Sequence, residues 1–251
     1  MKKPKVEILY QDESIVVVNK PSGLLSVPDR FDVNIPNLKH LLAEIFGQTV
    51  RTVHRLDRDT SGVICFAFTE DAHRHLSQQF SAHTPRKTYW ALVEGALATT
   101  EGTIDFPLVE DPRKPGRMMI AAKGLETHTA YRVLQQYQSV AWVAVNIFTG
   151  RTHQIRVHLR AIGHPLVGDP FYGQRSAFLV SSVKGKKFRL GKHATEQPLL
   201  ERTALHAAQL AFLHPTTEQL VEFEAPLPKD VRAVLQQLEK WDSLTPKNKS
   251  E

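Results

Sequence analysis

Residues 53–68 read VHRLDRDTSGVICFAF, joining a crowded charged turn to an apolar run. Two carboxylates, two guanidiniums and an imidazole fall within His54–Asp59, and Thr-Ser-Gly closes the turn. The run Val63–Thr69 predicts a buried strand, and Thr69 can cap a helix that continues to about Phe80. The charged segment is therefore either a solvated turn with internal ion pairs or a site where one carboxylate acts on an anionic partner.

Composition is typical of a globular protein. The 251 residues are 41% apolar and 23% charged, with a net charge of +6 and a pI of about 9.4, a bias that suits a phosphate-rich partner. The single cysteine, Cys65, excludes an internal disulfide. The start MKKPKVEILY has no apolar signal core, and no stretch approaches about 18 uninterrupted apolar residues, so we expect a soluble, cytoplasmic protein.

Periodicity along the chain predicts strands and helices in alternating groups. The predicted strands are Val6–Tyr10, Ser14–Asn19, Val63–Thr69, Lys87–Val93, Thr127–Gln136, Ala141–Phe148, Leu205–Leu213 and Gln219–Glu224. The predicted helices are Asn37–Phe46, Thr69–Phe80, Thr152–Ile162 and Val231–Trp241. Several strands follow one another without a helix between them, which predicts an α+β fold with a mainly antiparallel mixed sheet.

Three segments show no such periodicity. Asp111–Gly124 and Gln174–Glu201 are rich in Lys, Arg, Gly or Pro, and the second carries Lys184, Lys186, Lys187, Arg189 and Lys192. Both are either solvated surface loops or loops that contact a polyanion. The tail Thr245–Glu251 is polar and predicted to be disordered.

Several common sites are missing from the sequence. There is no glycine-rich phosphate loop, no dinucleotide fingerprint and no HExxH. His153 and His158 are five residues apart, about 140° around a helix, which does not suit a shared metal ion. Ser61 lacks the GxSxG surroundings of a hydrolase nucleophile. We therefore expect neither a metal nor a cofactor.

Asp57 is the residue whose surroundings best suit chemistry. A carboxylate beside arginines is favoured in its ionised form, which fits a nucleophile, a base or an electrostatic stabiliser better than a general acid. Asp59 competes for this role or hydrogen-bonds neighbouring amides within the turn.

HRLDRDTSG resembles in full the HRLDxxTSG signature of the RluA family of RNA pseudouridine synthases. Four further stretches resemble motifs of that family in the family's order: Asn19–Leu24 (NKPSGL), Arg86–Val93 (RKTYWALV), Thr149–Leu159 with Gly163–Asp169 (TGRTHQIRVHL, GHPLVGD), and Leu205–Ala207 (LHA). The resemblance covers residues 6 to about 226. It implies an enzyme that isomerises uridine in ribosomal or transfer RNA without a cofactor.

The resemblance also implies roles for individual residues. Asp57 would be the catalytic aspartate that enables cleavage of the glycosidic bond, Tyr89 would lie against the target base and assist proton removal from C5, and Arg156 would pair with Asp57. Leu205 would be an apolar wall of the uracil pocket, and Arg55 would insert where the flipped nucleotide leaves a gap. His54 and Arg58 are weaker substrate-binding candidates that mainly shape the loop.

Many relatives carry a small RNA-binding domain before the catalytic one, whereas this chain enters its first predicted strand at about Val6. We therefore expect a single catalytic domain over residues 1–242, acting as a monomer, with Lys184, Lys186, Lys187 and Arg189 among the candidates for RNA contact. Two alternatives remain open: a catalytically silent RNA-binding or RNA-folding protein on this scaffold, and a hydrolase of the nucleoside bond that uses the same carboxylate.

Overall fold

The computed structural model describes residues 5–191 and 194–244, whose contacts group into two compact units. The first unit runs up to Tyr89 and adds Asn146–Thr152 and Leu205–Leu227. The second contains Trp90–Val145, His153–Ala204 and the part that begins at Pro228. Strands β5 (Arg86–Glu94) and β10 (Val140–Ile147) contribute residues to both units. That residues 1–242 form one catalytic domain stays a prediction.

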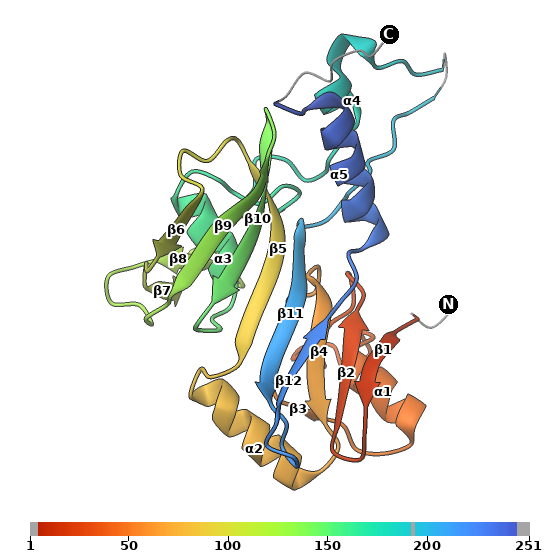
Figure 1. Cartoon of the computed structure of the whole chain (residues 1–251), viewed down its shortest axis with the longest axis vertical. Helices are drawn as coiled ribbons and strands as arrows, with labels where there is room; N and C mark the ends of the chain where they lie inside the picture. The colour runs from red at the N-terminus through yellow and green to blue at the C-terminus, as the bar shows by residue number, and fades with distance from the viewer. Residues whose placement is uncertain (1–4, 192–193, 245–251) are drawn as a thin grey trace. The chain divides into compact units, whose positions relative to one another are not determined.

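The first unit is built on a mixed sheet in which β1, β2, β4 and β11 follow one another, with β12 beside β11 and β3 beside β4 (Figure 1). β1–β2, β2–β4, β3–β4 and β11–β12 pair antiparallel, whereas β11 runs parallel to β4. Its elements are β1 (Glu7–Gln11), β2 (Ile15–Lys20), α1 (Leu38–Phe46), β3 (Arg51–Thr52), β4 (Ser61–Ala67), α2 (Glu70–Ser81), β11 (Leu205–Leu213) and β12 (Leu220–Glu224).

The core of the first unit follows from two apolar runs. Ile15–Val18 of β2 and all of β4 are buried, and they lie side by side with Val17 opposite Cys65. Strands buried in this way carry continuous rather than alternating apolar residues. Cys65 is fully buried, as its place in the sequence predicts, and burial raises the pKa of its thiol.

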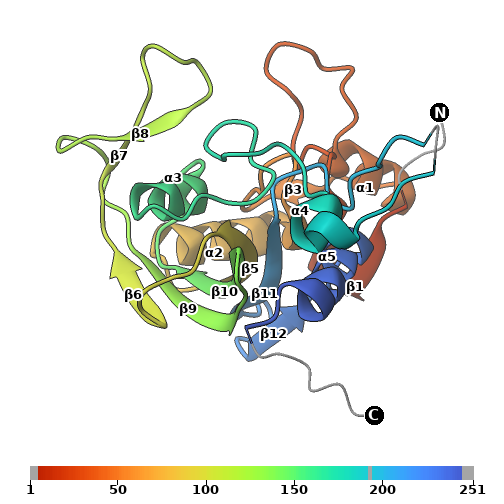
Figure 2. The ribbon, with the colours of Figure 1, turned by 90° about the horizontal axis from the view of Figure 1, so that it is seen from above.

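The second unit continues from the later part of β5 through β10, β9 and β6, with a separate β7–β8 hairpin. Figure 2 shows α4 beside α5. The remaining elements are β6 (Glu101–Ile104), β7 (Leu108–Glu110), β8 (Met118–Ile120), β9 (Thr129–Gln136), α3 (Gln154–Ala161), α4 (Ser181–Lys184), the 3₁₀ turn η1 (Gly185–Lys187) and α5 (Lys229–Trp241).

The α+β prediction with a mainly antiparallel mixed sheet is confirmed, as is the predicted helix cap at Thr69. Asn37 accepts a hydrogen bond from the His40 amide, Gly47 ends α1 in the left-handed conformation, and the Thr69 hydroxyl accepts from the Ala72 amide. α3 is shorter than the predicted Thr152–Ile162 because His153 takes a left-handed backbone conformation (φ 53°) and starts the helix at Gln154.

Other sequence predictions need correction. Asp111–Gly124 is not wholly irregular, because Met118–Ile120 forms β8 and pairs with Leu108–Glu110. Gln174–Glu201 contains α4 and η1. Such short elements are below the length at which periodicity is detectable. Lys192 and the tail Thr245–Glu251 lie outside the described residues.

Candidate active site

The charged turn lies between β3 and β4 of the first unit. The Leu56 side chain is buried, whereas Arg55 and Arg58 are exposed and Asp57 and Asp59 are half-buried. The Thr60 amide donates to the Asp57 carbonyl over 3.2 Å, which closes the turn. The apolar Leu56 therefore anchors a turn whose charged neighbours reach the surface.

Lys20, at the end of β2, hydrogen-bonds the main chain of this turn. Its side chain is fully buried, and Nζ donates to the main-chain carbonyls of Leu24 (2.7 Å), Arg58 (2.9 Å) and Pro21 (3.1 Å). An ammonium has three donors, so these three carbonyls match its capacity. A buried lysine tolerates its surroundings only when it is hydrogen-bonded, and here the bonds fix the turn to the end of β2.

Ser22, Gly23 and Ser26 also hydrogen-bond the turn. Together with Lys20 they form a group called the cradle of the turn. The Gly23 amide donates to the Arg58 carbonyl (2.9 Å), and the Ser22 hydroxyl donates to the Asp59 carbonyl (2.8 Å). The Ser26 hydroxyl bonds both the carbonyl (2.8 Å) and the amide (3.0 Å) of Leu56. The main chain is thus held on both sides of Asp57, and the Asp57 carboxylate is carried on a fixed backbone.

The end of the turn is fixed by Gly62, where β4 meets β11. Gly62 has a φ of 117°, and a Cβ there would lie 2.1 Å from the Ala207 carbonyl oxygen, so only glycine fits. Next to it, the buried Ser61 hydroxyl lies 3.0 Å from His206 Nδ1, and His206 Nε2 lies 3.1 Å from the Ala225 carbonyl. The carbonyl can only accept, so Nε2 carries a proton and donates it to Ala225. This buried pair ties the two strands together.

Tyr89 of β5 is buried within the electrostatic reach of Asp57. Burial, and secondly the negative charge of Asp57, raise the pKa of the Tyr89 phenol well above its ordinary value. The phenol is therefore neutral at physiological pH. Leu205, the first residue of β11, is also buried in the first unit. The structure thus brings Asp57 and Tyr89, predicted from separate motifs, into one neighbourhood.

His54 points into the protein. Its Nε2 accepts a hydrogen bond from the Cys65 amide (3.0 Å), and its ring stacks on Phe80 with centroids 4.5 Å apart. Burial, and secondly the charge of Lys87, lower the pKa of His54 to about 3. These contacts suit a loop-shaping role for His54; its predicted contact with substrate has no support among them.

The two flanking arginines differ in their contacts. Exposed Arg55 donates from Nη2 to the Thr152 hydroxyl over 3.2 Å, which links the turn to the TGRTH motif within the first unit. Arg58 donates from Nε to the Gly23 carbonyl over 3.1 Å and so belongs to the cradle. The contact of Arg55 is thus with a side chain, whereas that of Arg58 is with the main chain.

Arg156 lies on α3 in the second unit, where it forms a bidentate ion pair with Asp169. Its Nε and Nη2 donate to the two Asp169 oxygens over 2.7 and 2.8 Å, and both side chains are buried. Burial alone would raise the pKa of Asp169, but the hydrogen bonds and charge of Arg156, with the amides of Phe171 and Tyr172, hold it below its ordinary value. The pairing of Arg156 with Asp57 that the resemblance implies stays a prediction.

The basic segment Asp111–Gly124 lines an open pocket of about 230 Å³ in the second unit, between the β7–β8 hairpin and α3. Lys114, Arg117 and Arg160 are among its lining residues. The Arg117 guanidinium stacks on the half-exposed Phe171 ring, 4.6 Å from its centroid. Cationic and aromatic groups on one surface are typical of RNA-binding proteins.

The second basic segment gathers around Trp241 of α5. Lys184, Lys187 and Lys240 place their ammonium groups 5.0, 5.6 and 5.2 Å from the indole centroid. Lys186 and Arg189 are exposed beside them. The segment is thus not a featureless solvated loop, since an aromatic ring collects three like charges.

Sequence reasoning missed Lys20, Ser26 and Asp169 as residues that position others. Lys20 and Asp169 lie inside the NKPSGL and GHPLVGD motifs, so a signal was present, whereas Ser26 carries none.

Within the described ranges, no group of three or more His, Cys, Asp or Glu side chains is arranged to hold a metal ion. No described helix has the length and apolar character needed to span a membrane.

Comparisons with known proteins identify the family. Residues 14–161 match the family described as RNA pseudouridylate synthase. The chain is 38% identical over 235 residues to an uncharacterized RNA pseudouridine synthase of Bacillus subtilis (91% of this chain, 70% of that protein). It is 40% identical over 222 residues to the dual-specificity RNA pseudouridine synthase RluA of Yersinia pestis (88% and 95%). Among solved structures, human RNA Pseudouridylate Synthase Domain Containing 4 matches with a TM-score of 0.71 and 28% identity, covering 93% of each chain.

Proposed function

The chain belongs to the RluA family of RNA pseudouridylate synthases, which isomerise uridine in RNA to pseudouridine, and we propose that Asp57, Tyr89 and Arg156 are its catalytic residues. The observation that carries this proposal is the arrangement of the first unit. Lys20 hydrogen-bonds the turn that contains Asp57, and the Asp57 carboxylate is close enough to Tyr89 to raise the pKa of its phenol.

The reaction breaks the bond between N1 of uracil and C1′ of the ribose, turns the base, and joins C5 to C1′ with loss of the C5 proton. N1 recovers a proton, so no atom is gained or lost and no redox change occurs. Positive charge develops on the sugar as the bond breaks, and the Asp57 carboxylate is suited to meet it, as nucleophile or as electrostatic stabiliser. A fixed backbone spares this carboxylate reorganisation during the reaction.

Tyr89 acts in its neutral form in this proposal. Its raised pKa makes the free phenolate rare at neutral pH, so a contact with the uracil ring and a hydrogen bond that orients the base are its main contributions. Assistance in removing the C5 proton then requires transfer of the phenol proton to a neighbouring group at the same time. Leu205, buried at the start of β11, is proposed to supply an apolar wall for the uracil.

Arg156 is proposed to stabilise the ionised carboxylate of Asp57. Its Nε and Nη2 are bound to Asp169, an arrangement that fixes the guanidinium plane. An arginine held in this way presents its charge in one orientation, which a flexible lysine could not do.

The remaining cations serve the RNA. Arg55 is exposed, and a guanidinium plane can both stack in the gap left by a flipped base and contact phosphate. The Arg117–Phe171 pair and the lysines around Trp241 extend the cationic surface of the second unit. We propose that both basic segments contact the RNA backbone.

A relative named for the ribosomal large subunit supports a ribosomal RNA substrate, and we propose ribosomal or transfer RNA as the substrate class. A cytoplasmic location and a monomeric state complete the proposal. The silent RNA-binding alternative is not favoured, because the relatives are named as enzymes. The remaining alternative, a nucleoside-bond hydrolase, would use the same Asp57 carboxylate and would release free uracil from RNA.

The test is site-resolved mapping of pseudouridine in total RNA from cells with and without the gene, complemented by the wild-type chain or by the Asp57→Asn variant. We expect uridines whose modification disappears with the gene and returns only with the wild-type chain. Release of free uracil from RNA by the purified protein would instead identify a hydrolase. Full modification with the Asp57→Asn variant would remove Asp57 from the catalytic centre.

A further inference from the structure

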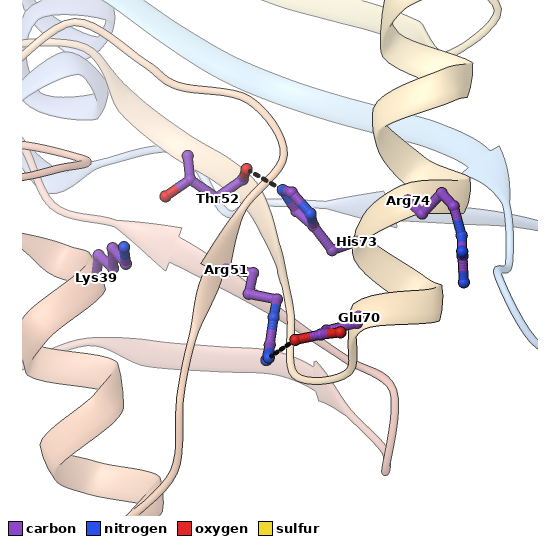
Figure 3. Close-up of a pocket in the computed structure, with 6 residues that line it drawn as sticks. All are labelled: Lys39, Arg51, Thr52, Glu70, His73 and Arg74. Atoms are coloured by element: carbon purple, nitrogen blue, oxygen red, sulfur yellow. Dashed lines mark hydrogen bonds and ion pairs between the residues drawn. The ribbon is translucent and has the colours of Figure 1, made fainter.

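A second cationic pocket lies in the first unit, apart from the residues assigned to catalysis. It has a volume of about 570 Å³ and is bounded by α1, β3 and α2. Figure 3 shows Lys39 of α1 on one side, Arg51 and Thr52 of β3 in the middle, and Glu70, His73 and Arg74 of α2 on the other. None of these residues has a role in the reaction proposed above.

Internal partners neutralise two of the cations. Arg51 Nη2 lies 3.1 Å from Glu70 Oε1, and its Nη1 donates to the Phe68 carbonyl. Arg74 pairs with Asp71. The Lys39 ammonium, by contrast, has no hydrogen bond or ion pair with any part of the chain that the structure describes. Among the described residues that line this pocket, Lys39 is thus the cation whose positive charge no internal partner neutralises.

Two further features suggest that the pocket takes an anion. Lys39 is in the first turn of α1, where the helix dipole disfavours a cation, and a bound anion would offset this cost. The Thr52 hydroxyl, in the same wall, is buried and has no hydrogen-bond partner among the described residues. A rotation of this side chain would let it donate to a ligand oxygen.

The shape of the surface favours a strand over an isolated ion. A second hollow of about 470 Å³, lined by Lys39, His40 and the segment Gly47–Val50, adjoins the first. Lys39 lines both hollows, so one residue borders two spaces that successive nucleotides could occupy. An extended polyanion would use both, whereas a single phosphate would need only one.

We propose that this pocket binds a phosphodiester group of the RNA substrate through Lys39, with Arg51 and the Thr52 hydroxyl as secondary donors. The inference rests on the proposed function for the identity of the polyanion. His73 Nε2 donates to the Thr52 carbonyl over 3.1 Å, and β3 leads directly into the turn that carries Asp57. RNA held here is therefore held by the same segment that positions the catalytic carboxylate.

The experiment measures binding of a fluorescent single-stranded oligouridylate and of unmodified transfer RNA to the full chain over a range of NaCl concentrations. We expect Lys39→Ala to lower the slope of log affinity against log salt by about 0.7 for the single strand. It should weaken binding at low salt by up to about five-fold, and Lys39→Glu should weaken it more. Lys5→Ala removes the same charge from an exposed position of the same unit and should leave the slope unchanged.

Titration with inorganic phosphate, followed through the NMR signals of the His73 ring, separates the possible ligands. One outcome is that phosphate binding depends on Lys39 while the slope of log RNA affinity against log salt is equal in wild type and Lys39→Ala. This result would indicate a site for small anions and would overturn the proposal. Equal RNA slopes without phosphate binding would overturn it too. A Lys39-dependent slope in a protein that forms no pseudouridine would refute the proposed function and leave this inference standing. The KM for RNA should rise in Lys39→Ala and stay at the wild-type value in Lys5→Ala.

Discussion

The turn that carries Asp57 and the basic segment Gln174–Glu201 are both rich in charge, yet the chain holds them in opposite ways. Around Asp57, main-chain groups of Leu56, Arg58 and Asp59 are bound by Lys20, Ser22, Gly23 and Ser26. In the basic segment, Phe178 pairs with Leu200 and Ser181 with Glu196, while Lys184 and Lys187 lie over the Trp241 ring.

The difference matches the demands of the two tasks. A reacting carboxylate must be placed to within a fraction of an ångström, which requires directional hydrogen bonds to the backbone. Attraction between lysines and phosphates falls off slowly with distance and tolerates movement, so cation–π contacts suffice to gather the charges. Rigid support therefore predicts sensitivity to single substitutions in the turn and gradual effects in the basic segment.

The largest effect is expected from the carboxylates of the turn. Asp57→Asn should lower the turnover of RNA uridines by about 10²–10⁴-fold, because it removes the charged group while keeping its size and the backbone bonds. Single-turnover assays that follow release of tritium from C5 of uridine would measure this. Asp59→Asn is the matched control, since it removes the same charge from the same turn and keeps the main-chain carbonyl that Ser22 binds. Equal losses in both variants would show that the turn's total charge, and not Asp57, is what matters.

The next effect tests the support itself. Lys20→Met keeps the length of the side chain but leaves the carbonyls of Pro21, Leu24 and Arg58 without their donor. We expect turnover to fall by about 100-fold through misplacement of Asp57, and the free energy of unfolding to fall by about 1–3 kcal/mol. Turnover and urea unfolding would be measured on the same samples.

Asn19→Ala is the control for Lys20→Met, because Asn19 is the neighbour on β2 and its side chain bonds Glu7 at the exposed edge. It should leave turnover close to wild type. If Lys20→Met folds and turns over RNA at the wild-type rate, the hydrogen bonds from Lys20 are not needed for catalysis. The turn would then need no firmer support than the basic segment.

The sequence predicts the scaffold of the site better than its support. The strand of Val63–Ala67, the cap at Thr69 and the α1 boundaries follow from local chemistry, since apolar runs and capping side chains act over a few residues. Motif resemblance places Asp57 and Tyr89, which the structure brings together through the sheet of the first unit. The cradle could not be predicted, because Ser26 and Leu56 meet only after β2 and β4 pair.

The inward orientation of His54 could not be predicted either. The imidazole is surrounded by charged residues in the sequence, yet the backbone turns it toward the Cys65 amide and the Phe80 ring. The same applies to Lys184 and Lys187, whose partner Trp241 is more than fifty residues away in the chain. Contacts between segments that are distant in the sequence set these side-chain orientations. The local sequence pattern therefore does not predict them.

The buried His54 gives a pH test of the rigid region. Its pKa is about 3 in the folded protein against an ordinary 6.5, so between these values the unfolded chain binds a proton that the folded chain does not. Its contribution to stability is complete above pH 6.5 and is lost as the pH falls, by at most about 1.4 kcal/mol per pH unit. Urea unfolding at a series of pH values would measure this slope.

His54→Gln can still accept from the Cys65 amide but does not titrate, so its unfolding free energy should depend less on pH across that window. His40→Gln, on an exposed part of α1, should keep the wild-type dependence. A slope identical in wild type and His54→Gln would mean that His54 is accessible to protons in the folded protein, and the turn is looser than its hydrogen bonds indicate.

The smallest effect is expected in the basic segment. Lys184→Ala together with Lys187→Ala removes two of the three ammonium groups around Trp241 without touching any hydrogen bond of the cradle. Affinity for RNA should fall only a few-fold at low salt, and the slope of log affinity against log salt should fall by about 0.7 for each phosphate of a single strand that the variant no longer neutralises. Turnover at saturating RNA should remain that of wild type, because the charges gather RNA and do not position Asp57.

Trp241→Leu sharpens this last test. It keeps all three lysines and an apolar side chain on α5 but removes the ring that collects them. If the ring gathers the charges, the variant should weaken RNA binding slightly while the salt slope stays near wild type, since the same number of cations remains to meet phosphates. A slope that falls as far as in the double lysine variant would mean that the aromatic ring fixes the lysines as firmly as hydrogen bonds fix the turn. The two regions would then differ in chemistry but not in rigidity.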